Sequence, residues 1–210
     1  MNCDKIARAY RWLEYAAFGR ALERRRFRFI AEAAGARRAL LLGDGDGRFL
    51  ARFAAASGAS IDYVDASTRM LELARREVLK SRAGARCIAY RHADARTFPL
   101  APAEYDLIVT HFFLDCFNAS DLECLIARTA LATQPGAQWI VSEFRQPPWA
   151  TPILSALYLF FRITTELTTR RLTDHRPLLM KYGFRLQCEE TSRLGLLASE
   201  LWVKHELSSQ

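Results

Sequence analysis

The ten residues from Leu40 to Phe49 constrain this chain of 210 residues more than any other stretch. Three leucines, Leu40 to Leu42, run directly into Gly43-Asp44-Gly45-Asp46-Gly47. An apolar run that ends in glycines predicts a buried strand and a tight turn, because glycine has no Cβ and adopts a left-handed backbone readily. A helix is expected to begin directly afterwards. A strand, a glycine turn and a helix in this order are typical of a ligand-binding loop in an α/β protein.

The two carboxylates of this loop indicate the charge of the ligand. A helix N-terminus ordinarily favours a phosphate, but Asp44 and Asp46 would repel a pyrophosphate and attract an ammonium or a sulfonium. The spacing G-x-G-x-G also departs from the dinucleotide pattern G-x-G-x-x-G. Asp65, 22 positions after Gly43, ends a second predicted strand, where a carboxylate can bind a ribose diol. A nucleoside with a positively charged tail fits these features; the alternative is a ligand-free turn, with Asp65 capping the next helix.

Beyond this loop, strands and helices alternate, which predicts right-handed crossovers and a mostly parallel sheet with helices on both faces. Two short helices are expected before the sheet. Ser67 is expected to cap one helix, and Ser120 with Glu123 to form the capping box of another. The expected strands are 38–42, 60–64, 86–90, 105–110 and 137–143, followed by an antiparallel extension from 183–188 and 196–203.

This succession of elements resembles the class I S-adenosylmethionine-dependent methyltransferases. The resemblance implies a Rossmann-like α/β fold with a seven-stranded, mostly parallel sheet and a C-terminal antiparallel hairpin, and it implies S-adenosyl-L-methionine as the cofactor. Leu41 stands where many members carry an acid, which is a departure from the family pattern. The residues matched to the family's cofactor site are Gly43, Asp44, Gly45 and Gly47 for the methionine part, Asp65 for the ribose, and Ala66, Met70, Asp94 and Ala95 for the adenine.

The segment before the sheet, residues 4–19, is similar to the leading segment of quinone-biosynthesis-type methyltransferases. In that family the segment closes over the cofactor, so Tyr10 is a candidate lid contact, although it can equally be a packing residue. The resemblance implies one methyltransferase domain over 1–210. Its expected parts are a helical lid (1–35), a cofactor-binding core (36–145), a substrate roof (146–182) and C-terminal strands (183–210).

Two side chains near the end of the fourth predicted strand are candidates for catalysis. His111 can take a proton near neutral pH, and Asp115 can abstract a proton or orient the acceptor. The alternatives are a histidine that is hydrogen-bonded or lines the cofactor site, and a carboxylate at a helix start. Phe112, Phe113 and Phe117 either line an aromatic pocket or pack in the core. The other histidines lack metal-ligand spacing, so no metal is expected.

The net charge of +7 raises the question of an acidic partner. Arginines dominate and are spread along the chain without interleaved stacking aromatics, so a nucleic-acid partner is not favoured. Solvated helix faces explain the two clusters best, ahead of an anionic substrate or a membrane surface. The clusters are Arg20, Arg24, Arg25, Arg26 and Arg28, and Arg162, Arg170, Arg171, His175 and Arg176.

The apolar stretch 153–161 is too short to span a bilayer and is either a buried or an interfacial helix. As a roof over the site it would favour a small hydrophobic or aromatic acceptor. The five scattered cysteines and the lack of a secretory signal predict a reduced, cytoplasmic protein whose thiols pack as small apolar groups.

The predicted function is therefore a methyl transfer from S-adenosylmethionine to a small molecule. Two alternatives stay open: an aminopropyl transferase on the same scaffold, and a non-catalytic protein that binds a membrane surface. The sequence leaves the oligomeric state and the acceptor atom undetermined.

Overall fold

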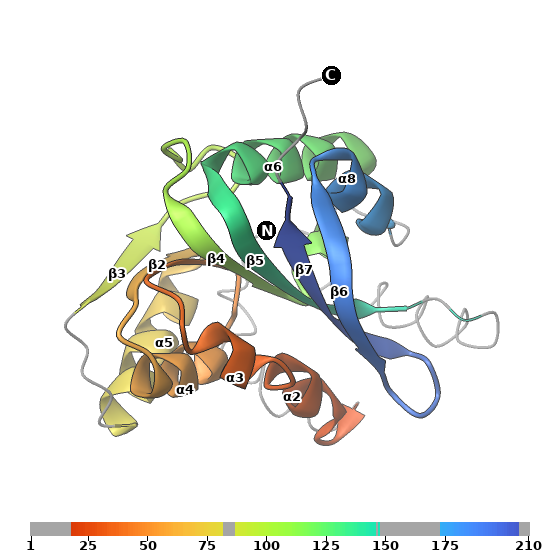
Figure 1. Ribbon diagram of the computed structural model, residues 1–210. Coiled ribbons are helices and arrows are strands. Elements are labelled where there is room, and N and C mark those ends of the chain that lie inside the picture. The colour runs from red at the N-terminus through yellow and green to blue at the C-terminus, as the bar shows by residue number, and fades with distance from the viewer. Residues whose placement is uncertain (1–17, 82–86, 146, 148–172, 206–210) are drawn as a thin grey trace.

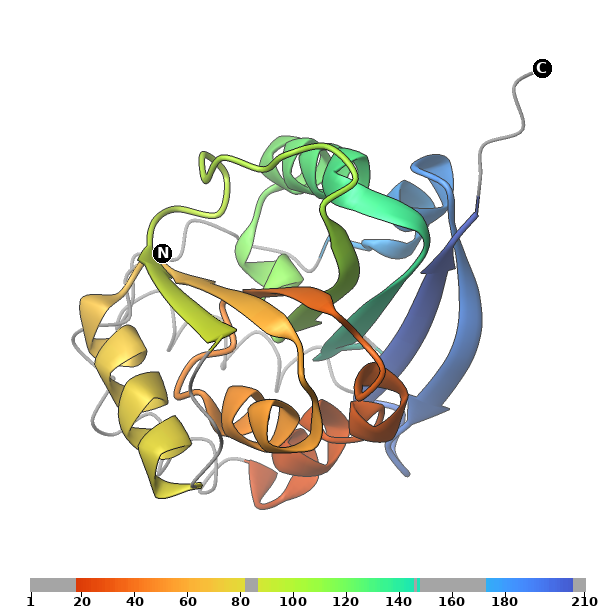
Figure 2. The same cartoon turned by 60° about the vertical axis from the view of Figure 1, so that its left-hand side comes forward.

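The computed structural model describes residues 18–81, 87–145, 147 and 173–205, and these form one sheet with helices on both faces (Figures 1 and 2). The strand order is β3-β2-β1-β4-β5-β7-β6, with β5-β7 and β7-β6 antiparallel and the other neighbours parallel. The predicted fold class is confirmed. The strands are β1 (Arg38–Leu42), β2 (Ser60–Asp65), β3 (Ile88–His92), β4 (Tyr105–His111), β5 (Thr133–Phe144), β6 (Phe184–Thr191) and β7 (Leu197–Lys204).

Alternate residues of the strands pack into two hydrophobic cores, one on each face of the sheet. Leu41 belongs to the core under α3, α4 and α5, whereas Leu40 and Leu42 belong to the core under α6 and α8. Both faces of β1 are covered from Ala39 to Leu42, which is why these four residues are apolar. The helices are α2 (Ala21–Arg26), α3 (Ile30–Ala33), α4 (Arg48–Ala56), α5 (Thr68–Lys80), the short 3-10 helix η2 (Leu114–Cys116), α6 (Ala119–Ala132) and α8 (Arg176–Lys181).

The chain order creates a switch point between β1 and β4. The chain passes from β1 outward to β2 and β3, then returns to place β4 on the other side of β1. In open α/β sheets of this kind, ligands bind where the carboxyl ends of such strands diverge. The loops at this point are residues 43–47, after β1, and residues 112–116, after β4.

Several expected boundaries were wrong. Helix α6 begins earlier than predicted: Asn118 is its N-cap and accepts a hydrogen bond from the backbone N–H of Asp121 at 2.9 Å. Ser120 lies within the first turn and donates to the Asn118 side chain instead of capping the helix. Strand β5 begins at Thr133, so it includes the Pro135-Gly136 turn, and its pairing with β4 shifts register there. Both described helices before the sheet follow Gly19; the region of the earlier expected helix lies outside the described residues.

The expectation of packed thiols was also wrong for the described cysteines. Cys87, Cys124 and Cys188 are exposed and Cys116 is half-buried, and all are free thiols. Cys124 lies on α6, Cys188 on β6 and Cys87 just before β3, at exposed positions that residue type alone does not indicate. In the part of the chain that is described, no helix is long and apolar enough to cross a bilayer.

Gly47 offers a test of how the glycine loop fits its neighbours. Its φ is +77°, and a Cβ there would lie 2.5 Å from Ala74 on α5. We expect Gly47→Ala to lower the free energy of unfolding by about 2–4 kcal/mol, from left-handed backbone strain and steric overlap together. Gly195→Ala is the matched control, because Gly195 has a φ of +68° but open space around it, and it should cost about 1–2 kcal/mol. Equal losses in urea denaturation would contradict the proposed contact with α5.

Candidate functional site

The loop between β1 and α4 has a backbone that side chains rarely permit. Gly43, Gly45 and Gly47 have φ values of +62°, +70° and +77°. A Cβ on Gly43 would lie 2.1 Å from the ring of Phe113, so the loop passes directly against the loop that follows β4. The N–H of Gly43 donates to the carbonyl of Val64 at 3.0 Å, which fixes the start of the turn to β2. Left-handed backbone and close approach both explain the glycines here.

The two carboxylates of the loop are buried and differ in their surroundings. Asp46 pairs with Arg48, whose Nε lies 2.8 Å from Oδ1. Asp44 is 2% exposed and accepts a 3.3 Å hydrogen bond from the N–H of Leu50 through Oδ2. Burial raises the pKa of Asp44 to about 7, although the nearby charge of Arg26 opposes this shift. Oδ1 of Asp44 has no hydrogen-bond partner among the described residues.

The residues predicted to hold the ribose and one edge of the adenine lie at the end of β2 and the start of α5. Asp65 is half-buried, and its Oδ1 accepts a 2.8 Å hydrogen bond from the N–H of Ser67. Ser67 caps α5, as expected, by accepting from the N–H of Met70 at 3.1 Å. Met70 is buried, and the carbonyl of Ala66 lies 3.1 Å from Nε2 of His92. Asp65 therefore ends the strand next to β1, and Ala66 and Met70 follow it in the turn and in the first turn of α5.

Asp94 and Ala95 follow β3, one strand further from β1. Asp94 forms an ion pair with Arg96 at 2.6 Å and also accepts the N–H of Arg96 at 2.9 Å. Hydrogen bonding from the Arg96 side chain holds the pKa of Asp94 below its ordinary value. Ala95 is buried against the core under α6. Asp94 is thus ionised at neutral pH and still has lone pairs for a further donor.

His111 ends β4 inside the protein. It is 1% exposed, and its ring meets that of Phe49 edge to face with 4.8 Å between centroids. Neither ring nitrogen has a hydrogen-bond partner among the described residues, so the expected alternative of a backbone-bonded histidine is not seen there. Burial, with the charge of Arg26, lowers the pKa of His111 well below its ordinary value. The imidazole is therefore neutral at pH 7 and can accept a proton.

The residue after His111 has an unusual backbone. Phe112 has a φ of +54°, a left-handed conformation that costs a bulky residue about 1–3 kcal/mol. Its N–H donates to the carbonyl of Ser142 on β5 at 2.7 Å, which holds it there. Its ring lies 5.3 Å from that of Phe144, and the rings of Phe113 and Phe117 meet at 5.0 Å. Aromatic rings therefore gather at the carboxyl ends of β4 and β5; Phe144 is buried and the other three are half-buried.

Asp115 lies close to a second buried acid that the sequence analysis missed. Asp115 is 9% exposed in η2, and Glu143 at the end of β5 is 3% exposed. Oε1 of Glu143 accepts the N–H groups of Phe113 at 2.9 Å and Leu114 at 2.7 Å. Burial, together with the charge of Asp115, raises the pKa of Glu143 well above its ordinary value. The hydrogen bonds of Glu143 fix the loop after β4. The sequence did offer a signal for this residue, because Glu143 is an acid near the end of an apolar strand.

Arg26 is the other residue of the site that the sequence analysis missed. It was assigned to a solvated helix face, but it is 1% exposed, and its guanidinium lies 5.4 Å from the ring centroid of Phe112. Its charge acts on both Asp44 and His111. Its neighbour Arg25 is also largely covered and pairs with Glu190 at 2.6 Å. The solvated-face interpretation was therefore wrong for these two arginines, because α2 packs against β7.

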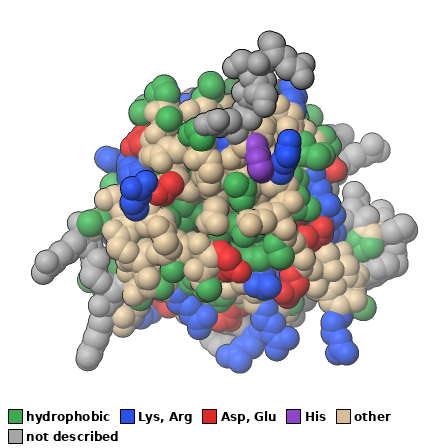
Figure 3. Space-filling view, viewed as in Figure 1, with side chains coloured by type: hydrophobic (Ala, Val, Ile, Leu, Met, Phe, Trp, Pro, Cys, Tyr) green, Lys and Arg blue, Asp and Glu red, His purple; other side chains and the backbone are tan. Residues whose placement is uncertain are grey.

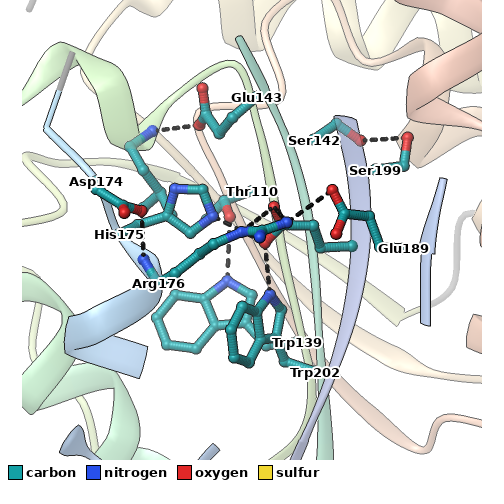
Figure 4. A network of polar contacts seen from close by, with 12 residues as sticks. Thr110, Trp139, Ser142, Glu143, Asp174, His175, Arg176, Glu189, Ser199 and Trp202 are labelled. Atoms are coloured by element: carbon teal, nitrogen blue, oxygen red, sulfur yellow. Dashed lines mark hydrogen bonds and ion pairs between the residues drawn. The ribbon is translucent and has the colours of Figure 1, made fainter. Parts of the chain in front are cut away.

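The second predicted arginine cluster is also partly internal. Glu200 on β7 is 1% exposed and binds His175, Arg176 and the indole N–H of Trp202, in the network drawn in Figure 4. Arg145, just after β5, reaches the same carboxylate at 3.2 Å. Although burial opposes ionisation, hydrogen bonding from His175 and the charge of Arg176 hold the pKa of Glu200 below its ordinary value. This network joins the residue after β5 to the N-terminal end of α8.

The remaining basic side chains do not form one stripe on the visible face. On the face drawn in Figure 3, Lys and Arg side chains lie in several separate places with acidic ones between them. Within the described ranges, no three His, Cys, Asp or Glu side chains are grouped to hold a metal ion. Tyr10, the apolar stretch 153–161 and the arginines 162–171 lie outside the described residues.

Asp44 gives a testable pH dependence. Its folded pKa is about 7 and its ordinary value 3.8, so the folded state binds a proton more tightly than the unfolded state. The contribution of Asp44 to the free energy of unfolding is largest below pH 3.8 and is lost as the pH rises through about 7. We expect Asp44→Asn, which keeps an oxygen for the Leu50 N–H, to gain stability relative to the unaltered protein across this window. Denaturation at several pH values measures the difference; a constant difference would contradict the assignment.

Comparison with known proteins shows which proteins this chain resembles. The family model described as a methyltransferase domain matches residues 39–136. A demethylmenaquinone methyltransferase from Beutenbergia cavernae is 30% identical over 95 residues, a match that spans 45% of this chain and 38% of that protein. The match thus covers well under half of the relative's length.

Solved structures agree on the fold. The N-methyltransferase NodS from Bradyrhizobium japonicum, in complex with S-adenosyl-L-homocysteine, has a TM-score of 0.65 at 14% identity over 89% of each chain. The mitomycin 7-O-methyltransferase MmcR has a TM-score of 0.70 at 18% identity over 97% of this chain and 61% of that one. With the strand order and the glycine loop, these likenesses identify the chain as one with the class I S-adenosylmethionine-dependent methyltransferase fold, carrying the methyltransferase-domain pattern over residues 39–136.

Proposed function

We propose that this protein transfers a methyl group from S-adenosyl-L-methionine to a small, hydrophobic or aromatic acceptor. The observation that carries the proposal is the glycine loop at the switch point of the sheet, with Asp65 ending the adjacent strand. A dinucleotide would bring a pyrophosphate to this loop, and the buried carboxylates of Asp44 and Asp46 disfavour that.

The residues at this place fit the proposed cofactor. Oδ1 of Asp44, a buried acceptor without a partner among the described residues, suits the ammonium of the methionine part. The glycines leave the backbone of residues 43–47 open to the same part, and Asp65 would accept hydrogen bonds from the ribose hydroxyls. Ala66 and Met70 would pack on the adenine, with Ala95 and the ionised Asp94 near its amino group. We keep Tyr10 as a candidate lid contact.

Catalysis in this proposal depends on positioning. When bound, the cofactor would supply a methyl group on a sulfonium, whose C–S bond would break to leave a thioether as the methyl passes in line to the acceptor. The loop after β4, held by Glu143 and by the Phe112 N–H, fixes the aromatic side chains that would orient the acceptor. Such alignment contributes about 7–11 kcal/mol of barrier reduction in well-oriented systems. His111 would accept the acceptor's proton, because its imidazole is neutral at pH 7. Asp115 would orient the acceptor.

An apolar acceptor is supported by the side chains at the carboxyl ends of β4 and β5. Phe144 packs with Phe112 and Phe18, and Phe113 packs with Phe117. Two of the similar proteins are named for methylation of demethylmenaquinone and of mitomycin. We further propose that residues 1–35 form a lid and residues 146–182 a roof over the 36–145 core, with 183–210 completing the sheet.

Cofactor binding by Asp65 is the first test. Isothermal titration with S-adenosylmethionine should give saturable heat. Asp65→Ala should raise the dissociation constant for S-adenosylmethionine about tenfold to a hundredfold, because the two ribose hydroxyl groups lose a charged acceptor. Asp65→Asn, which keeps the oxygen for the Ser67 N–H, separates loss of charge from loss of local structure. Glu72→Ala on the exposed side of α5 is the control and should bind normally. The absence of heat with the unaltered protein would refute the proposal.

The role of His111 is tested by turnover with an identified acceptor. His111→Ala should lower kcat about 10²- to 10⁴-fold, as loss of a general base does, with cofactor affinity retained. Because the pKa of His111 lies well below 6.5, kcat/KM should stay level as the pH falls to 6.5 and decline only in stronger acid. His205→Ala, at an exposed position, is the control. Unchanged turnover in His111→Ala would remove this residue from the mechanism.

A further inference from the structure

The sheet alone gives little support to the loop that carries Asp94. This loop follows β3, which lies at the edge of the described sheet and pairs there with β2 alone. The side chains of β3 are half-buried or exposed, so the strand itself is not enclosed by a core. A carboxylate that binds a ligand in a fixed direction needs a rigid support. The loop after β3 must therefore obtain that support from other elements.

Within the loop, the backbone turns tightly at Asp94. The carbonyl of Asp94 accepts the N–H groups of Thr97 at 3.0 Å and Phe98 at 2.8 Å. Its carboxylate accepts the N–H of Arg96 at 2.9 Å. These bonds tie both the backbone and the side chain of Asp94 to the next four residues. Whatever holds residues 95–98 in place therefore also fixes the direction of the Asp94 carboxylate.

One arginine of α6 holds residues 95–98. The segment from β3 to β4 passes beside α6 (Figure 2), and Arg128 of this helix is half-buried. Its Nη2 donates to the carbonyl of Phe98 at 2.6 Å. Its Nη1 donates to the carbonyl of Arg96 and, more weakly at 3.5 Å, to that of Ala95. A guanidinium carries its donors in a rigid planar fork, so a single side chain can fix several carbonyls of one turn.

The other contacts between this loop and α6 constrain Asp94 less. Arg96 pairs with Asp121 of α6 at 3.1 Å, but these two side chains are 46% and 37% exposed. Exposed ion pairs contribute little, because water screens their charges. Ala95 and Phe98 pack on the core under α6, and such apolar contacts are not directional. The hydrogen bonds of Arg128 are therefore the main directional link between α6 and the loop.

We propose that Arg128 is a positioning residue for the adenine end of the cofactor: by holding residues 95–98 it fixes Asp94 where this carboxylate accepts a hydrogen bond from the adenine amino group. The inference rests on the proposed function, since it concerns the same cofactor. Arg128 acts through Asp94 and does not touch the ligand. Its effect is therefore on the choice between an adenine and a purine with an oxo group at position 6.

The test compares two ligands, S-adenosylhomocysteine and S-inosylhomocysteine, which carry an amino and an oxo group at position 6 of the purine. Isothermal titration gives both dissociation constants. The unaltered protein should bind the adenine ligand about tenfold to a hundredfold more tightly, because a carboxylate accepts from the amino group and repels the oxo oxygen. In Arg128→Met, which keeps an unbranched apolar stem, this ratio should fall about threefold or more, since hydrogen bonds weaken steeply when they lose alignment.

Lys204→Met is the matched control. Lys204 is also half-buried, and its Nζ donates to the carbonyl of Thr133 at 3.0 Å and to that of Ala130. This substitution removes the same kind of contact near the C-terminal end of α6, and both carbonyls lie outside residues 95–98. The ratio in Lys204→Met should therefore equal that of the unaltered protein. In Asp94→Asn the ratio should fall to about one or below, because an amide can donate to the oxo group.

The outcomes separate this role from the proposed function. If the unaltered protein binds neither ligand, the proposed function fails. If it binds both equally, or if Arg128→Met lowers the denaturation midpoint but keeps the ratio, the methyltransferase assignment stands and the positioning role is overturned. If Arg128→Met does not fold, Arg128→Lys decides. Lysine keeps the charge but not the planar fork, so the ratio should fall part of the way, and an unchanged ratio would overturn the role.

Discussion

The left-handed backbone of the glycine loop is the constraint on which the site depends. It lets the chain leave β1, turn within five residues and begin α4 with Gly47 as its N-cap. Because glycine has no Cβ, Phe113 can lie against Gly43, and Ala74 can lie against Gly47. The loop is thus held between the segment after β4 and helix α5. Any side chain at these two positions would separate elements that the switch point of the sheet brings together.

Buried charge is concentrated at the same end of the sheet. Asp44, Glu143 and Glu200 each lie at 3% exposure or less: Asp44 in the loop after β1, Glu143 near the end of β5 and Glu200 on β7, the neighbour of β5. Their surroundings differ: Glu200 has cationic partners that keep it ionised, whereas burial favours the protonated forms of Asp44 and Glu143. Such groups cost stability, and their concentration near one edge is typical of a functional site.

The sequence predicted the sheet and the loop well because both follow from local patterns. Apolar runs that end in glycine or an acid marked β1 and β2, and the two strands pair in parallel, as expected for a mostly parallel sheet. The predicted start of helix α6 was wrong because more than one residue near it has a side chain that can cap a helix. Asn118 caps α6 because its side-chain oxygen accepts the N–H of Asp121, and Ser120 lies within the first turn. Residue type also failed to show that Arg26 is internal, because burial of a helix face depends on what packs against it.

The sequence by itself determined where three parts of the candidate site lie along the chain: the glycine loop after one strand, Asp65 at the end of the next, and His111 at the end of another. These positions follow from periodicity and from the backbone freedom of glycine, which are local properties. Only the tertiary structure decided which distant groups join them. Arg26, Glu143 and the Glu200 network reach their places through contacts between segments far apart in the chain. The charge state of each then depends on burial and on neighbours that no local pattern specifies.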